Sequence, residues 1–138
     1  MSELKLQKTE LIARDGTPVR LVYDTEADIL DIFFGENGSA SGIELTEQMI
    51  LRIDPIQKRA LSLMLLHFSI LSEQTAYGPR NFAIDKLERL PEELRELVLR
   101  LLTSPPVNQF IKLSQFQLSP QEQRPLAYVE SQPIAVYA

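Results

Sequence analysis

The sequence lacks cysteine altogether, contains a single histidine and has fewer basic than acidic residues. Without cysteine the chain forms no disulfide, and it has no thiolate nucleophile and no Cys-ligated zinc or iron–sulfur site. The formal net charge is −5, whereas nonspecific binding to a phosphate backbone needs Lys and Arg in excess. We therefore expect no nucleic-acid partner, and no cofactor is predicted.

Long apolar runs are also missing. No run approaches the roughly 20 apolar residues that a membrane-spanning helix needs, and the run Leu63 to Leu66 has the length of a strand. Residues Met1 to Lys5 do not show the basic and then apolar order of a secretory signal. These absences predict a cytoplasmic protein without a membrane partner.

The composition is that of an ordinary globular chain. Its 138 residues are enough for one domain with a real core, and 44% of them are apolar and 24% charged. The last part of the chain is richer in Gln and Pro than the rest. We expect a single α+β domain over residues 1–118, followed by an extended C-terminal tail over residues 119–138.

Four apolar runs predict the core of that domain. They are joined by short polar links, and they cover residues 19–23, 29–34, 49–53 and 60–68. The first link, Asp24 to Asp28, has hairpin length, and Pro55 suits the second position of a turn. Gly35 to Gly42 is interpreted as a flexible loop. This order predicts an antiparallel β-meander of about four strands.

One helix is predicted after the meander. Pro91 suits the first helical position, and the segment Pro91 to Leu102 carries apolar residues at helical spacing. These residues are Leu94, Leu97, Val98, Leu101 and Leu102. We expect the helix to cover one face of the sheet. Phe110 to Leu118 is interpreted as a further strand or a docked arm.

The alternation within the runs sorts the side chains onto two faces. Leu30, Ile32 and Phe34 share one face. The opposite face would be polar if it met water, but it is also largely apolar. Its apolar residues are Ile29, Phe33, Ile50, Met64, Leu66 and Phe68. One helix covers only one face, so the second needs the C-terminal arm or a second copy, and we expect a homodimer.

The densest acidic group lies around the first link: Asp24, Glu26, Asp28 and Asp31. Clustered carboxylates bind divalent metal ions, so a metal site is one interpretation. A calcium-binding loop that starts at Asp24 would need Gly as its sixth residue and Glu as its twelfth, but the sequence has Ile29 and Gly35 there. The alternative is that Asp24 and Asp28 accept hydrogen bonds from turn amides. We expect this structural role and no metal site.

Two further polar residues occupy unusual positions. Asp31 lies between apolar neighbours on the second face, and we expect it to pair with Arg52 across the sheet. His67 is the only histidine and shares a face with Ser69, so it could act as a general base beside a nucleophile. The sequence has no Gly-x-Ser-x-Gly motif, however, and we favour a partly buried histidine at a strand end.

The first two runs resemble a known family. The pattern Tyr23-Asp24-x-Glu26-x-Asp28-x-Leu30-x-Ile32-x-Phe34, followed by two more apolar strands around an acidic turn, is similar to the small bacterial domain of unknown function 2283. The resemblance covers residues 19–68. Its second half departs from the family, because the turn after Asp54 has no Gly and Met64 stands where Glu is expected. The resemblance implies a compact β-rich unit and no assigned activity.

Two functional hypotheses follow. The apolar second face favours a non-enzymatic protein–protein interaction or accessory module that self-associates, with an antitoxin-like role among the options. A protein partner besides the second copy is compatible with this hypothesis. The alternative is a small metal-dependent hydrolase or nuclease that uses the carboxylates between Asp24 and Asp31.

Overall fold

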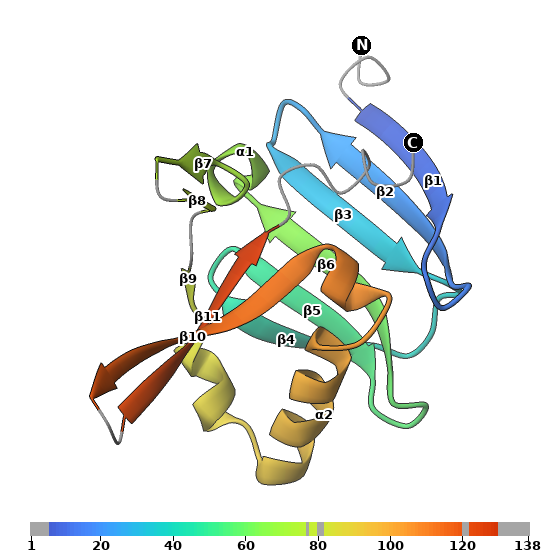
Figure 1. Ribbon diagram of the computed structural model, residues 1–138. Coiled ribbons are helices and arrows are strands. Elements are labelled where there is room, and N and C mark those ends of the chain that lie inside the picture. Colours follow the sequence, from blue (N-terminus) through green and yellow to red (C-terminus); the bar gives the residue numbers. More distant parts are fainter. Residues whose placement is uncertain (1–5, 77, 80–81, 120–121, 130–138) are drawn as a thin grey trace.

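The computed structural model describes residues 6–76, 78–79, 82–119 and 122–129, and it shows a mixed α+β fold (Figure 1). Most of it is a six-stranded antiparallel sheet and one main helix. The strands of this sheet are β1 (Leu6–Ile12), β2 (Pro18–Asp24), β3 (Ile29–Phe34), β4 (Ser41–Thr46), β5 (Met49–Asp54) and β6 (Arg59–Leu66). The α+β class and the four strands expected between residues 19 and 68 are confirmed.

The order of the strands differs from the expected meander. The sheet runs β1-β2-β3-β6-β5-β4, so β3 pairs with β6 and not with β5. Each half of the sheet is a meander, and residues 35–40 carry the chain from the end of β3 to the far edge. The stretch Gly35 to Gly42, expected as a loop, therefore contains the start of β4. The sequence does not indicate this strand clearly, because it begins with Ser41 and Gly42, which are neither apolar nor typical of strands.

One face of the sheet, which we call the inner face, forms the core. Along β3, Leu30, Ile32 and Phe34 are at most 4% exposed, as their shared alternation predicts. Strands β5 and β6 contribute buried residues in the same way: Met49, Leu51, Ile53, Leu63 and Leu65. The inner face thus continues without a polar gap across the join between the two halves.

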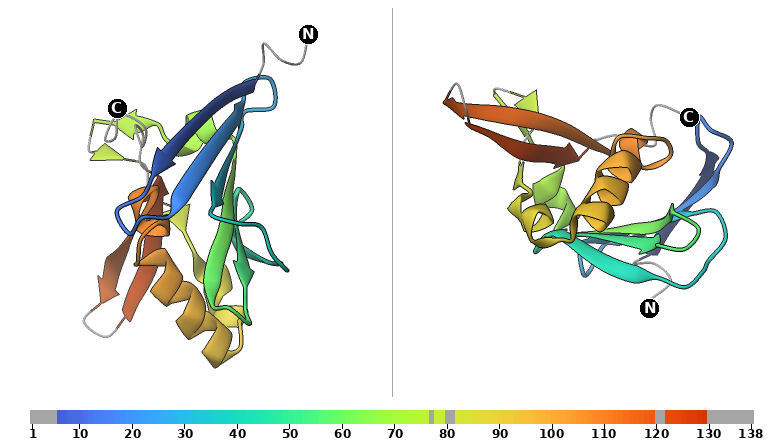
Figure 2. Two further views of the ribbon diagram at one scale, coloured as in Figure 1. Left: turned by 90° about the vertical axis from the view of Figure 1, so that its right-hand side faces the viewer. Right: turned by 90° about the horizontal axis from the view of Figure 1, so that it is seen from below.

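The inner face is covered by helix α2 (Glu92–Leu102) and by the segment after it, which forms η3 (Val107–Gln109) and β10 (Ile111–Ser119). Leu102 of α2 is 1% exposed, and the Phe110 ring centroid lies 6.0 Å from that of Phe34. Figure 2 shows α2 and the C-terminal hairpin on the same side of the sheet. The predicted covering helix is confirmed, and its first helical residue is Glu92.

The C-terminal arm is a β-hairpin. Strand β10 pairs antiparallel with β11 (Glu122–Val129), which pairs on its other side with the short strand β9 (Phe82–Ala83). The strand expected from Phe110 to Leu118 is confirmed within one residue at each end. The stretch expected as an extended tail, however, contains β11. The strand was not predicted because its segment is rich in Gln and contains Pro125, a composition that is typical of linkers.

The remaining short elements connect the sheet to α2: α1 (Phe68–Leu71), β7 (Gln74–Thr75), β8 (Gly78–Pro79) and the 3₁₀ helix η2 (Asp85–Arg89). Helix η2 lies against β4, and an ion pair of 2.6 Å joins Lys86 of η2 to Glu44 of β4. No helix in the described part of the chain is long and apolar enough to span a membrane.

Candidate functional site

The face of the sheet opposite the core, which we call the outer face, is defined by the strand register. Paired residues point to the same side of a sheet, so the pairing traces rows of side chains across the six strands. One row, the arginine row, runs Glu10, Arg20, Phe33, Ser62, Arg52 and Gly42. The next row, the aspartate row, runs Lys8, Val22, Asp31, Met64, Ile50 and Glu44.

Apolar side chains at the centre of the outer face remain partly exposed. They are Ile29, Phe33, Ile50, Met64 and Leu66, five of the residues predicted for the second apolar face. Helix α2, β10 and β11 all lie on the inner side (Figure 2), so none of them covers these side chains. The described part of the C-terminal arm is therefore excluded as the cover of the outer face.

Phe68, the sixth residue predicted for this face, lies elsewhere. His67 has a left-handed backbone conformation, with φ 54°, and it turns the chain out of the sheet after β6. Phe68 begins α1 and packs edge-on against the Tyr23 ring, with 5.5 Å between the ring centroids. It is partly buried against the core, so the expected run from Ala60 to Phe68 ends as a strand at Leu66.

Two arginines stand on the outer face beside its aromatic residue. The Arg20 guanidinium lies 4.6 Å from the centroid of the Phe33 ring, which is a cation–π contact. The Arg52 Nη1 atom lies 3.5 Å from Ser62 Oγ. Arg20, Arg52 and Phe33 line a depression of about 630 Å³ together with Asn37. Neither guanidinium forms an ion pair with another described residue, so both charges remain available to a partner.

The Asp31 carboxylate lies between Val22 and Met64 in the aspartate row. Burial raises the pKa of Asp31 above its ordinary value, and the nearby charge of Arg52 only partly offsets this effect. The predicted cross-strand pair with Arg52 is not formed, because β6 separates their strands. Among the described residues the carboxylate has no hydrogen-bond or ion-pair partner, which leaves a half-buried acid that the charge of Arg52 compensates only in part.

The Asp28 carboxylate joins the β2–β3 turn to α1. It accepts hydrogen bonds from the Tyr23 hydroxyl (2.6 Å), the Ser69 hydroxyl (2.5 Å) and the Ser69 amide (3.0 Å). Partial burial raises the pKa of this carboxyl, but the hydrogen bonds from Ser69 and Tyr23 hold it below its ordinary value. The hydrogen bond that the Tyr23 hydroxyl donates to Asp28 raises the pKa of Tyr23 to about 12. This cluster fixes the turn in place.

Asp24 has the turn role that the sequence predicts. Its Oδ1 atom accepts hydrogen bonds from the amides of Glu26 (3.0 Å) and Ala27 (3.1 Å), and Glu26 is exposed in the turn. Asp28, predicted for the same role, differs because it ends the turn beside α1. Among the described residues, no group of three His, Cys, Asp or Glu side chains is placed to hold a metal ion.

His67 and Ser69 do not form a catalytic pair with Asp28. A triad needs the histidine between the nucleophile and the carboxylate, whereas the Ser69 hydroxyl donates directly to Asp28. His67 is exposed and not partly buried as predicted, because its left-handed backbone turns it away from β6. Sequence reasoning misses the contact between Asp28 and Ser69, since 41 positions separate them and no local pattern links the two.

Comparisons of the chain with protein-family models, curated proteins and solved structures found no match. The resemblance to the domain of unknown function 2283 therefore stays a prediction. So does the alternative of a metal-dependent hydrolase or nuclease. The outer face and the Asp28 cluster are accordingly interpreted from their own geometry, and the outer face is the one that leaves both apolar surface and charges for a partner.

Proposed function

We propose that the protein is a non-enzymatic interaction module that forms a homodimer through its outer face. The observation that carries this proposal is a set of partly exposed apolar side chains, centred on Phe33 and Met64, on a sheet whose inner face is buried. A monomer rarely leaves a large contiguous apolar patch in water. A second copy supplies an identical patch, so one self-complementary surface is enough.

The size of the outer face supports this assignment. Six strands spaced about 4.8 Å apart, each about six residues long at roughly 3.3 Å per residue, give a face of roughly 500 Å². Two such faces together reach the size of about 1,000 Å² that a specific interface needs. Sheets that pack face to face keep their strand directions within about 30° of each other, which brings most of both faces into contact.

The test is light scattering across a dilution series, for the wild type and for Phe33→Glu. We expect a dimeric wild type and a monomeric variant, because the variant loses the aromatic ring at the centre of the patch and would have to bury a charged group in its place. Ile56→Glu is the matched control, since Ile56 is 87% exposed in the turn between β5 and β6. It should remain dimeric.

Two outcomes would count against the proposal in different ways. A wild type that is monomeric at high micromolar concentration would exclude the homodimer. A wild type that dimerises together with a Phe33→Glu variant that dimerises equally well would preserve self-association, but it would exclude the outer face as the interface.

A further inference from the structure

The outer face carries its charges in an order that a second copy can match. The arginine row contains Arg20 and Arg52, and the adjacent aspartate row contains Asp31 and Glu44. At the β1 edge the order is reversed, with Glu10 in the arginine row and Lys8 in the aspartate row. Apart from the β1 edge, the arginine row is therefore basic and the aspartate row acidic, and their charges lie on different strands.

Only one of the two simple two-fold arrangements brings opposite charges together without also placing like charges face to face. An axis that crosses the strands between the rows places the arginine row of one copy on the aspartate row of the other. Glu10 then lies opposite Lys8 of the second copy. An axis along the strands through the centre of the sheet instead places each row on its own copy with the strand order reversed. Arg20 then faces Arg52, whereas Asp31 faces Met64 and Lys8 faces Glu44. Facing arginines are unfavourable, and the axis that crosses the strands avoids them, so the pattern favours that axis.

Within that arrangement, one pair of opposite charges has no ion pair inside its own chain among the described residues. Arg20 is exposed and stacks on the Phe33 ring, and its cross-strand neighbour Glu10 forms no ion pair with it among the described residues. Asp31 is half-buried between apolar side chains. In contrast, Glu44 is already paired with Lys86 at 2.6 Å. Arg20 lies on β2, one strand away from the position opposite Asp31, and this is within reach of an arginine side chain.

We propose that Arg20 of each copy binds Asp31 of the second copy, and that this pair sets the orientation of the homodimer. The proposal rests on the proposed homodimer, and it adds which two-fold arrangement is formed. Arg20 supplies the hydrogen-bond donors that the desolvated Asp31 carboxylate lacks within its own chain. A small anion bound in the depression beside Arg20 would use the arginine but would have no need of Asp31.

The test is a charge swap between two variants. Arg20→Glu has acids at both positions, Asp31→Arg has arginines at both, and each variant alone should dimerise at least about tenfold more weakly than the wild type. Mixed together, the two variants place Glu opposite Arg and Asp opposite Arg, so a heterodimer should form. The double variant with both changes in one chain should dimerise again. Analytical ultracentrifugation measures all four samples.

Controls and opposite outcomes separate this proposal from the homodimer itself. Lys58→Glu is the control for charge reversal, because Lys58 is exposed in a turn away from the face, and it should not change dimerisation. Should a reversed variant lose its cooperative thermal unfolding, Arg20→Gln and Asp31→Asn provide the milder pair, and each should weaken the dimer. Single variants as dimeric as the wild type, or a mixture that stays monomeric, would exclude the Arg20–Asp31 pair. A monomeric wild type would exclude the homodimer as well.

Discussion

The two hairpins at the centre of the sheet share one turn geometry and differ in their anchors. In the β2–β3 turn, Asp24 accepts hydrogen bonds from the amides two and three positions after it, at 3.0 and 3.1 Å. Asp54 does the same in the β5–β6 turn, with both distances 3.0 Å. The last turn residue is left-handed in both, with φ 58° at Asp28 and 56° at Lys58. The backbone of the turn is thus set by an aspartate at its start, independent of the residues between.

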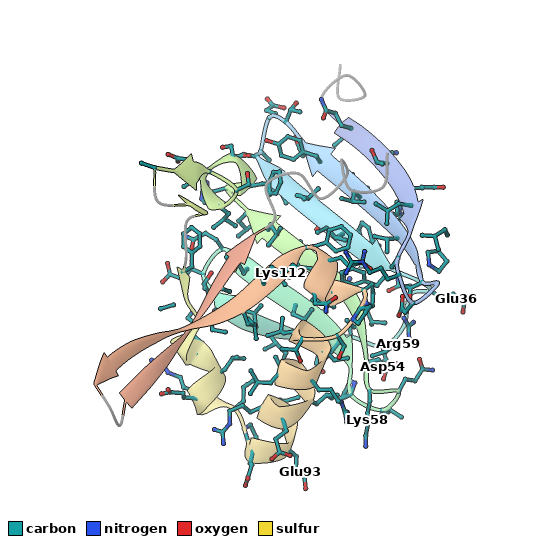
Figure 3. All side chains as sticks on the ribbon, viewed as in Figure 1. Glu36, Asp54, Lys58, Arg59, Glu93 and Lys112 are labelled. Atoms are coloured by element: carbon teal, nitrogen blue, oxygen red, sulfur yellow. The ribbon has the colours of Figure 1, made fainter. Side chains whose placement is uncertain are left out.

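The anchors show what the side chains add to this common backbone. Asp28 fastens the first turn to α1 through Ser69. In the second hairpin, Arg59 instead holds the loop after β3, because its guanidinium donates to the carbonyls of Phe34 (3.2 Å) and Glu36. Figure 3 shows Arg59 and Glu36 at the same end of the sheet. The first hairpin is therefore held by an aspartate that binds α1, and the second by an arginine that binds the loop after β3.

The largest effect should come from equivalent core positions in the two hairpins. Ile32 and Leu63 are both 0% exposed on the inner face, so Ile32→Ala and Leu63→Ala should each lower the free energy of unfolding by about 2–5 kcal/mol. Urea unfolding measures both, with Ile56→Ala as an exposed control that changes little. A loss below about 1 kcal/mol at only one position would show that the halves do not share one core.

The left-handed turn residues should respond to glycine with opposite signs. Lys58→Gly removes the strain of a side chain in this conformation, so the free energy of unfolding should rise by up to about 1 kcal/mol. Asp28→Gly removes the same strain, but it also removes the carboxylate that accepts hydrogen bonds from Tyr23 and Ser69. The free energy of unfolding should therefore fall by about 1–2 kcal/mol. Denaturant unfolding measures both variants. Two changes of equal sign and size would show that the Asp28 anchor contributes nothing.

The smallest effect is a pH dependence confined to the first hairpin. The folded pKa of Tyr23 is raised from 10.0 to about 12, so its contribution to stability is complete below pH 10 and is lost as the pH rises through about 12. The folded pKa of Asp28 is lowered, so its contribution is complete above its ordinary value of 3.8 and is lost as the pH falls through the folded value.

Tyr23→Phe isolates the alkaline part of this dependence. The stability difference between the wild type and this variant should be constant near neutral pH and should disappear between pH 10 and about 12. Unfolding by urea at fixed pH values provides the measurement. A difference that stays unchanged across this alkaline range would contradict the hydrogen bond between Tyr23 and Asp28.

The parts of the fold that follow from local periodicity were predictable. Strands β2, β3, β5 and β6 have the two-residue alternation, and α2 has the helical spacing of Leu97, Val98 and Leu101. The position of β4 was not predictable from such patterns, because the length of the Gly35 to Gly42 stretch does not say at which edge the chain re-enters the sheet. The β3–β6 pairing depends on that choice.

Of the outer face, only the apolar residues were predictable from the sequence. Ile29, Phe33 and Met64 alternate with core residues, so their shared face follows from strand geometry. The placement of the charges depends on the register between β3, β6 and β5, and this register includes a bulge at Leu61 that no local pattern indicates. The expected Asp31–Arg52 pair was wrong because it assumed that β3 and β5 are adjacent, whereas β6 lies between them.

The position of η2 along β4 has a consequence for aggregation. A strand at the edge of a sheet offers unpaired amides and carbonyls on which a strand of another molecule can assemble. Helix η2 lies against β4, and the Lys86–Glu44 ion pair ties it there, so it obstructs that edge. At the opposite edge, β1 carries the exposed charges of Lys8 and Glu10, which disfavour the stacking of identical strands. Fibril growth strand by strand is therefore hindered on one side and disfavoured on the other.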